Sequence, residues 1–289
     1  MKRWGFFLLL VSGMLFPLFS IEWPTDSRTI RRSFGMNGGG RFFGGFEFTT
    51  ESPIYTIDAG EVLFFDNDFY TPIRGFPSPL QNWIAIEHQE ALISIYGKLE
   101  GVSERASALI DKGTPLGIPR KQRGTGERLL YFSLYDRENK QWVHPALLLP
   151  SYEDTKAPLI RQVQLVPRDG TAAVVLGRTR TCKQGTYQIY LDVIDTFDAN
   201  PSITTVPFTY QCFVNGIEHS RLQVDTLYVK EGKLLMGKQK SFPVEQVYRK
   251  DGLLYLGDIQ LTRGKVKIEF LVTDLAGNQR TSTFDLMVE

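Results

Sequence analysis

The sequence predicts an all-β protein, and three observations support this fold class. Apolar and polar residues alternate with a period of two in many short segments; from Tyr187 to Val193, every second residue is large and apolar. Turn residues separate these segments. Asp251-Gly252 is a hairpin signal, because glycine accepts the positive φ of a tight turn. Helical periodicity is almost absent, and the single stretch that could hold a helix, VSERASALIDKG (102–113), could equally be a short turn.

Length and charge limit the class of protein. The chain has 289 residues, which corresponds to one or two domains. It carries 33 lysines and arginines against 32 aspartates and glutamates. This balance argues against a nucleic-acid-binding protein, which needs a basic face to neutralise phosphates. A hydrophobic content of 42% is enough for a packed core.

The first twenty residues differ from the rest of the chain. Two basic residues precede an apolar run that is short for a membrane-spanning helix and is interrupted by Pro17. We therefore expect residues 1–20 to be a secretory signal peptide cut after Ser20, and the protein to be exported to the periplasm or cell envelope. An uncleaved anchor is the alternative, because Leu18 is not ideal at the third position before the cut. After Ser20 no apolar run is long enough to enter a bilayer, so no membrane insertion is expected.

A polar segment with a proline, residues 151–159, suggests a domain boundary. We expect one β domain over residues 21–150 and a second over residues 159–289. The second range holds about seven or eight predicted strands, which suits a β-sandwich of immunoglobulin type. Its last turn, Asp274 to Asn278, reads D-L-A-G-N, as bacterial immunoglobulin-like modules often do before their final strand.

Two cysteines are present, Cys182 and Cys212. In an oxidising compartment they can form a disulfide, and the alternative is two separate buried thiols. The sequence does not place their Cβ atoms, so both readings stay open.

The first domain contains an ordered set of motifs. Residues 82–100, NWIAIEHQEALISIYGKLE, predict a hairpin that turns at His88-Gln89-Glu90. AGEVLFF (59–65) precedes it and KGTPLGIP (112–119) follows it. This order resembles the LytM/lysostaphin-type zinc endopeptidases, which cut peptidoglycan. The resemblance covers roughly residues 30–150 and implies a LytM/lysostaphin-like antiparallel β domain.

The resemblance also implies where zinc ligands would lie in an active member of that family, which uses His, Asp and His with a water in the fourth position. The family motif H-x-x-x-D falls on Phe43 to Glu47, and Y-x-H-L places Lys98 at the histidine position. H-x-H falls on Leu129 and Tyr131, and residues 120–140 contain no histidine. Phenylalanine and leucine offer no lone pair, and one carboxylate does not hold zinc. The resemblance therefore implies a degenerate site without zinc or any other cofactor.

We hypothesise that Glu47 and Lys98 form an ion pair where zinc would be, and that Phe43, Leu129 and Tyr131 fill the remaining space. Four further residues are candidates for lining the former cleft, although packing is the commoner role of phenylalanine and scattered surface positions the commoner role of arginine. These candidates are Arg41, Phe42, Phe46 and Arg123. The basic segment 120–128, RKQRGTGER, is the best candidate for contact with an anionic or peptide ligand.

The sequence therefore predicts an exported, non-catalytic pseudo-peptidase. Its expected partners are peptidoglycan, a cell-wall hydrolase or another envelope protein, and its role would be wall binding, scaffolding or regulation. One alternative is an active peptidoglycan hydrolase with altered, non-zinc chemistry, although no nucleophile with an adjacent base is evident. Another is a purely structural envelope protein.

Overall fold

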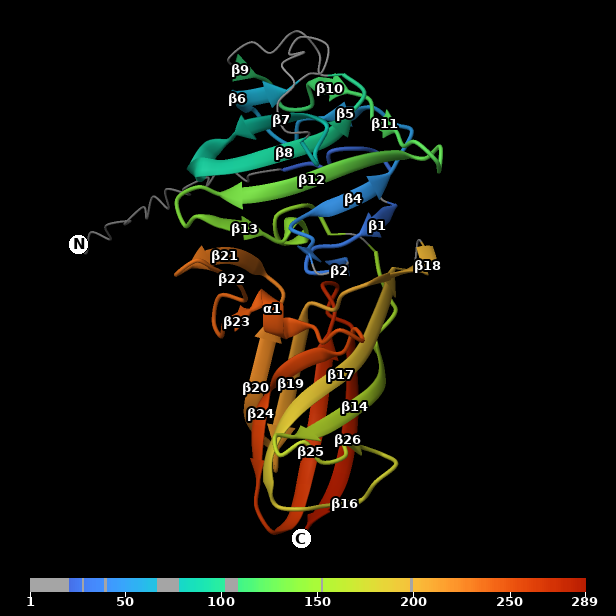
Figure 1. Cartoon of the computed structure of the whole chain (residues 1–289). Helices are drawn as coiled ribbons and strands as arrows, with labels where there is room; N and C mark the ends of the chain where they lie inside the picture. Colours follow the sequence, from blue (N-terminus) through green and yellow to red (C-terminus); the bar gives the residue numbers. More distant parts are fainter. Residues whose placement is uncertain are drawn as a thin grey trace, which may run out of the picture.

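A computed structural model describes most of the chain, namely residues 21–27, 29–38, 41–66, 78–101, 109–151, 153–197 and 200–289. The predicted signal peptide, residues 1–20, lies outside the described residues. Among the residues that the structure describes, no helix combines the length and apolar content needed to cross a membrane. The structure is built almost entirely from strands, as the sequence predicted (Figure 1).

The upper body in Figure 1 is organised around a twelve-stranded sheet, which we call the first sheet. Its main path runs β23-β22-β21-β13-β12-β8-β7-β6-β9, and β1, β4 and β11 attach to it beside β12. The strands are β1 (Ile30–Arg32), β4 (Phe46–Thr49), β6 (Gly60–Asp66), β7 (Asn82–Glu87), β8 (Leu92–Leu99), β9 (Leu109–Ile110), β11 (Arg120–Lys121), β12 (Arg128–Asp136), β13 (Gln141–Val143), β21 (Thr226–Lys230), β22 (Lys233–Met236) and β23 (Phe242–Pro243).

Short elements complete the upper body. They are the pairs β2 (Asn37–Gly38) with β3 (Arg41–Phe42) and β5 (Ile54–Tyr55) with β10 (Pro115–Gly117), and the 3-10 turns η1 (Gln89–Ala91) and η2 (Pro145–Leu147). The hairpin predicted for residues 82–100 is confirmed, because β7 and β8 pair and η1 forms their turn. Of the segment 102–113 that could have held a helix, Leu109–Ile110 is a strand and residues 102–108 lie outside the described part.

The lower body consists of two five-stranded sheets that share one core. One contains β14 (Leu159–Pro167), β15 (Val174–Val175), β17 (Gly185–Phe197), β18 (Asn200–Thr205) and β24 (Leu254–Leu261). The other contains β16 (Thr181–Cys182), β19 (Thr209–Val214), β20 (Ile217–Gln223), β25 (Gly264–Thr273) and β26 (Gln279–Val288). The turns predicted at Gly252 and at Asp274 to Asn278 are present, and α1 (Val244–Val247) is a single helical turn. The immunoglobulin type of this body stays a prediction.

One segment crosses the predicted boundary. Strands β21 to β23 follow residue 159 in the sequence, yet they extend the first sheet through the pairing of Trp142 with Leu227. The range 159–289 predicted for the second domain thus includes a segment, residues 226–243, that belongs to the first sheet. The two bodies are joined by a shared ladder as well as by the connecting chain (Figure 1).

The two cysteines are not bridged. Cys182 lies in β16 and Cys212 in β19, and both are free and buried. Strands β26 and β25 lie between them. Three strand spacings separate the two residues by at least ~14 Å, whereas the Cα atoms of a disulfide lie about 5.5 Å apart. The disulfide considered from the sequence is therefore excluded by the sheet order, and the alternative of two buried thiols is correct.

Candidate functional site

A row of paired residues crosses the first sheet and defines its candidate site. Glu47 in β4 lies opposite Tyr131 in β12, and Tyr131 lies opposite Gly97 in β8. Arg32 in β1 extends the row at one end and Trp83 in β7 at the other. Directly opposed residues of an antiparallel ladder point to the same side of the sheet. We call the side that carries this row the outer face.

The opposite side is closed by the core. Phe46, Phe48 and Phe132 alternate with the residues of the row, and all three side chains are fully buried. Tyr96 in β8 lies opposite Phe132 and is also fully buried. We call this side the inner face, and it supplies the rigid support on which the outer face is built.

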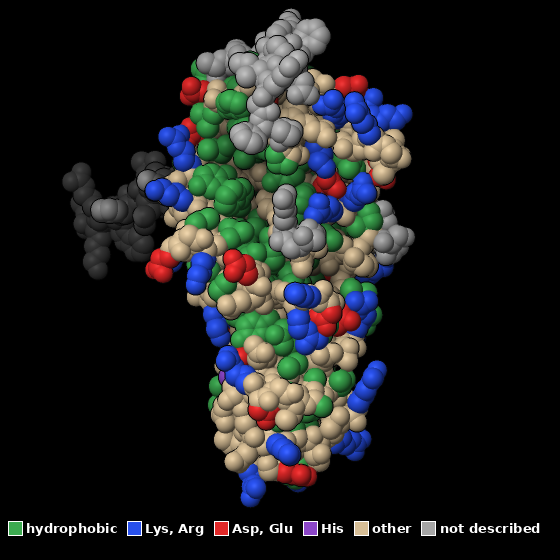
Figure 2. All heavy atoms as spheres, viewed as in Figure 1, with side chains coloured by type: hydrophobic (Ala, Val, Ile, Leu, Met, Phe, Trp, Pro, Cys, Tyr) green, Lys and Arg blue, Asp and Glu red, His purple; other side chains and the backbone are tan. Residues whose placement is uncertain are grey.

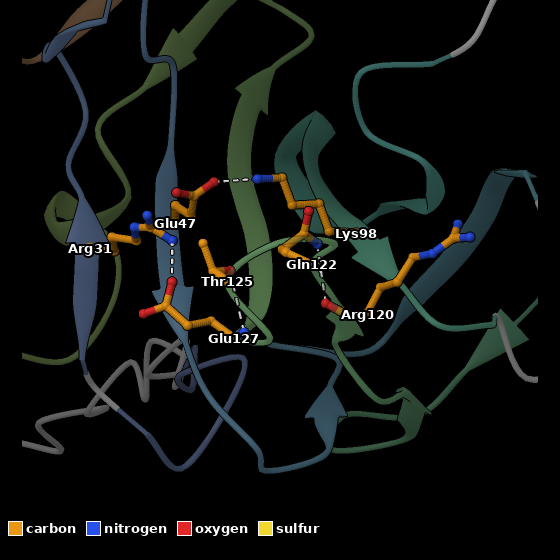
Figure 3. Close-up of polar contacts among 7 residues, drawn as sticks. All are labelled: Arg31, Glu47, Lys98, Arg120, Gln122, Thr125 and Glu127. Carbon is orange, nitrogen blue, oxygen red and sulfur yellow. Dashed lines mark hydrogen bonds and ion pairs between the residues drawn. The ribbon is translucent and has the colours of Figure 1, made fainter.

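Glu47 and Lys98 form the ion pair that was hypothesised from the sequence. The Lys98 Nζ atom donates a hydrogen bond to Glu47 Oε2. Their side chains are 5% and 19% exposed, so the carboxylate is nearly removed from water and its ammonium partner is partly hydrated. Figure 3 shows the two side chains pointing toward each other from β4 and β8. Lys98 has a φ of 63° at a register shift in the ladder between β7 and β8, which takes it out of the regular alternation and lets it reach Glu47.

Aromatic side chains surround this ion pair. The ring of Phe43 meets that of Tyr131 edge to face, with centroids 5.4 Å apart. The Arg32 guanidinium carbon lies 4.3 Å from the Phe43 centroid, within the range of a cation–π contact. Because Arg32 and Tyr131 are also the ladder neighbours of Glu47, Phe43 lies over the same part of the outer face. This arrangement fits the predicted filling of the space by Phe43 and Tyr131.

Leu129 lies on the same face as Tyr131, beside the row, and its part in filling the former site stays a prediction. It lies two residues before Tyr131 on the same face, but its ladder partners are Thr49 and Arg120. Its side chain is 5% exposed and supports the edge of the outer face beside β11. It is thus a neighbour of the row but has no place in the row itself.

Half-exposed apolar side chains continue along the outer face. Phe64 in β6 is 50% exposed and its ring lies 4.7 Å from that of Trp83. Ile95 in β8 is half-buried and lies opposite Ala85, which in turn lies opposite Phe64. Figure 2 shows hydrophobic side chains gathered in a band over the first sheet, with lysine and arginine side chains beside it. A contiguous apolar surface of this kind marks a binding region in a folded protein.

The basic segment 120–128 borders this face, and ion pairs hold its last two residues, Glu127 and Arg128. Arg31 Nη1 lies 2.7 Å from Glu127 Oε2, as Figure 3 shows, and Arg128 pairs with Glu100 and Glu51. Arg123 lies in the turn of the segment and is exposed. These ion pairs leave Arg123 free to meet a ligand at the rim.

Two of the candidate cleft residues lie elsewhere. Phe46 is fully buried on the inner face, where it packs against Trp23, Phe48 and His144. Phe42 packs against Tyr248 of the chain's second half, with ring centroids 5.4 Å apart. The sequence did not show where β4 begins, and the strand alternation that starts at Phe46 sends this side chain inward. The Arg41 side chain lies outside the described part, so its role stays a prediction.

Sequence reasoning missed Trp83, Phe64 and the specific contribution of Arg32. The strand alternation of residues 60–66 and 82–87 could have placed the first two on one face, but it does not say which strands become neighbours. Nothing in the sequence around Arg32 separates it from the other arginines of the chain. Its importance comes from the ladder with β4, which no local pattern reveals.

The donor set of the outer face does not fit a zinc ion. Glu47 is the one carboxylate of the row, and an ammonium group already occupies one of its oxygens. The three histidines lie apart: His88 bonds to Ala59 and Ser94, His144 to Ala146, and His219 to Asp258. Within the described ranges, no group of three His, Cys, Asp or Glu side chains could hold a metal ion.

Acid–base chemistry finds little support at this face. Burial raises the pKa of Tyr131, so its hydroxyl stays protonated at neutral pH. The Glu47 carboxylate is held by Lys98 and lies opposite the ring of Tyr131. The arrangement instead combines one ion pair, whose two charges cancel, with aromatic rings and exposed apolar side chains around it.

Comparison with known proteins gives matches of limited depth. A protein-family model matches residues 157–289, while no curated protein matches the chain. Among solved structures, Helicobacter pylori Csd3 is 19% identical, with 48% of this chain and 37% of Csd3 covered and a TM-score of 0.36. The chain thus spans just over a third of the length of Csd3.

Two further structures are of the peptidase type that the first-domain motifs resemble. A putative peptidase M23 from Pseudomonas aeruginosa is 18% identical, covers 40% of this chain and 44% of its own, and has a TM-score of 0.31. Lysostaphin is 10% identical, covers 93% of this chain and 96% of its own, and has a TM-score of 0.35. At this level the similarities carry no argument for function or partners. The chain is similar to M23 and lysostaphin-type structures, and its all-β fold is established by its own strands.

Proposed function

We propose that this protein is an exported, non-catalytic binding protein of the cell envelope, and that the outer face of its first sheet holds peptidoglycan. A role as a scaffold or regulator of a wall hydrolase is compatible with the same surface. Residues 30–150 resemble LytM-type peptidases, whose substrate is peptidoglycan. We infer that the face matching their active site binds the same polymer without cutting it.

The observation that carries the proposal is the ion pair of Glu47 and Lys98 beneath the rings of Phe43 and Tyr131. An active peptidase of the resembled type needs an open metal position at this place. Here the space is taken by groups that pair with one another. The alternative of a hydrolase with non-zinc chemistry is not favoured, because the one carboxylate is engaged and the tyrosine is protonated.

The surface beside the ion pair supports binding over a purely structural role. The rings of Phe64 and Trp83 lie 4.7 Å apart between centroids, and Phe64 is 50% exposed, so together they offer an apolar surface to a ligand. Stem peptides and sugar rings of the wall offer apolar faces to such rings. They also carry carboxylates, which the cations Arg32 and Arg123 at the rim could meet.

Co-sedimentation of residues 21–289 with purified peptidoglycan sacculi tests this proposal. We expect the wild type to pellet and the double variant Phe64→Ala, Trp83→Ala to lose most of its binding. Phe65→Ala is the matched control. Phe65 neighbours Phe64 and is 45% exposed, but it lies opposite Ile84 and so belongs to the other side of the sheet.

Three other results of the sedimentation experiment would each contradict the proposal. If nothing pellets, peptidoglycan is not the ligand and the structural role is favoured. If the double variant pellets like the wild type, a different surface binds the wall. If sacculi release soluble fragments with the wild type but not with Glu47→Gln, the protein is a hydrolase.

A further inference from the structure

A cavity lies in the upper body, beside the ladder of β13 and β21. It has a volume of about 500 Å³ and is bordered by η1, the β12–β13 hairpin, η2 and the start of β21. Figure 1 shows β13 and β21 side by side. We call this cavity the junction pocket. It is separate from the outer face, since none of its lining residues belongs to the row from Arg32 to Trp83.

One part of the lining of the junction pocket is apolar. Its aliphatic side chains come from four separate segments, and they are Ile21, Leu92, Val143, Leu147 and Leu148. The last two are 44% and 41% exposed, although both are large and apolar. Leucines left this accessible at the wall of a cavity offer contact area to an aliphatic ligand.

Another part of the lining of the junction pocket is acidic. Four carboxylates line it, from Asp58, Glu90, Asp136 and Asp225, against the single ammonium of Lys238. Within the part of the chain that the structure describes, none of these four carboxylates forms an ion pair. Among the described residues, the lining thus carries more negative than positive side chains, and no ion pair involves its carboxylates.

His88 does not supply the missing positive charge. It also lines the pocket, where its ring nitrogens bond to Ala59 O and Ser94 Oγ. Burial is the main cause of a lowered pKa for His88, so the ring is neutral at pH 7.

Asp225 is the residue that points most directly to a cationic ligand. It is only 8% exposed, and its carboxylate is bonded through Oδ1 to Thr226 Oγ1 and to the backbone N–H of Lys238. A carboxylate removed from water to this degree normally has a cation beside it, because burial of an uncompensated charge is costly. Here no described side chain provides that cation, while the cavity gives access to the group.

We propose that the junction pocket binds the lysine side chain of a peptide segment from a partner protein. An aliphatic stem that ends in an ammonium group matches a cavity whose lining combines aliphatic side chains with carboxylates. The volume of about 500 Å³ lies in the roughly 300–1,000 Å³ range of ligand pockets, so it accommodates a lysine and one apolar neighbour. This inference goes beyond the proposed wall binding and does not depend on it.

Binding at this place would act on two segments of the first sheet that are far apart in the sequence. Asp136 and Val143 belong to the hairpin of the first sheet, whereas Asp225 and Lys238 belong to the segment that returns from the chain's second half. A ligand that contacts both sides in the folded protein alone stabilises the junction by mass action. Thermal unfolding should therefore shift upward when the pocket is filled.

The test uses residues 21–289 and the blocked peptide N-acetyl-Leu-Lys-methylamide, with binding followed by NMR titration and by thermal unfolding. We expect saturable binding that shifts the amides of Leu92, Val143 and Asp225. The same peptide with norleucine or glutamate in place of lysine should bind at least tenfold more weakly. If the norleucine peptide binds equally well, or if the lysine peptide does not bind at millimolar concentration, the proposal is overturned.

Matched variants locate the site. Glu90 is exposed in η1, so the substitution Glu90→Gln should weaken binding of the lysine peptide severalfold without affecting folding. Glu138→Gln is the control, because Glu138 is exposed in the nearby β12–β13 turn but does not line the pocket. Equal effects of the two substitutions would mean that diffuse surface charge attracts the peptide, which contradicts a defined site. Loss of sacculus binding by the Phe64 and Trp83 variant with peptide binding retained would separate the two proposals.

Discussion

The two faces of the first sheet are made by the same strands but are built for different purposes. On the inner face, Phe46, Phe48 and Phe132 are fully buried and leave no room for charge. On the outer face, the residues between them include Glu47 and Tyr131, held beside Lys98 and Phe43. Alternation along a strand thus lets one side of a sheet provide stability while its other side carries charged and accessible groups.

The largest effect should come from the inner face. Phe132→Ala removes a fully buried ring and should lower the free energy of unfolding by about 3–5 kcal/mol. Urea unfolding of the variant and the wild type measures this difference. Tyr131→Phe, one residue away on the outer face, is the control and should change stability by less than about 1 kcal/mol. Similar losses for both variants would contradict the division between the two faces.

The ion pair of the outer face should behave as a coupled unit. Lys98→Met leaves the Glu47 carboxylate nearly buried without its partner, and we expect a loss of about 3 kcal/mol in urea unfolding. Adding Glu47→Gln removes the uncompensated charge and should restore most of that stability. If the double variant is as unstable as the sum of the two single variants, the pair is not the interaction that holds these residues together.

The free energy of unfolding should also depend on pH, because His144 is buried against the inner face and stays uncharged there. Burial lowers the pKa of His144 to about 3, whereas the unfolded chain has a value of 6.5. Below pH 6.5 the unfolded state therefore binds a proton that the folded state does not, and stability falls as the pH falls toward 3. Between pH 7.5 and pH 5 the expected loss is about 2 kcal/mol.

Urea unfolding across this pH range measures that loss. His144→Asn keeps an acceptor for the backbone N–H of Ala146 but cannot titrate, so its stability should depend less steeply on pH. The pH slope is the informative quantity, because the substitution also changes packing against Phe34 and Phe46. An unchanged slope would show that folding does not lower the pKa of His144.

The smallest effect should come from the rim. The side chains of Arg31 and Glu127 are 38% and 42% exposed, and an ion pair this accessible contributes about 0.5 kcal/mol. Glu127→Gln should therefore change the free energy of unfolding by no more than this, and less in high salt. A loss above about 2 kcal/mol in urea unfolding would mean that the segment 120–128 is a structural part of the outer face.

The sequence predicted the strands and the central hairpin, because both depend on local alternation. The pairing of Glu47 with Lys98 followed from the resemblance to LytM-type peptidases, in which the matching positions face one site. The sequence did not predict the inward position of Phe46, since the start of β4 decides that alternation. It also gave no sign that Leu227 would pair with Trp142, because ladders between distant segments depend on how the two bodies meet. The junction pocket was missed for the same reason.

The shared ladder of β13 and β21 has a consequence for synthesis of the chain. Strand β13 offers an unpaired backbone edge until Thr226 to Lys230 have been made, after β14 to β20. An open edge of this kind is a template for pairing with other chains. A fragment ending at residue 150 should therefore associate through β13, and the nascent first sheet would need protection until its last strands emerge from the ribosome.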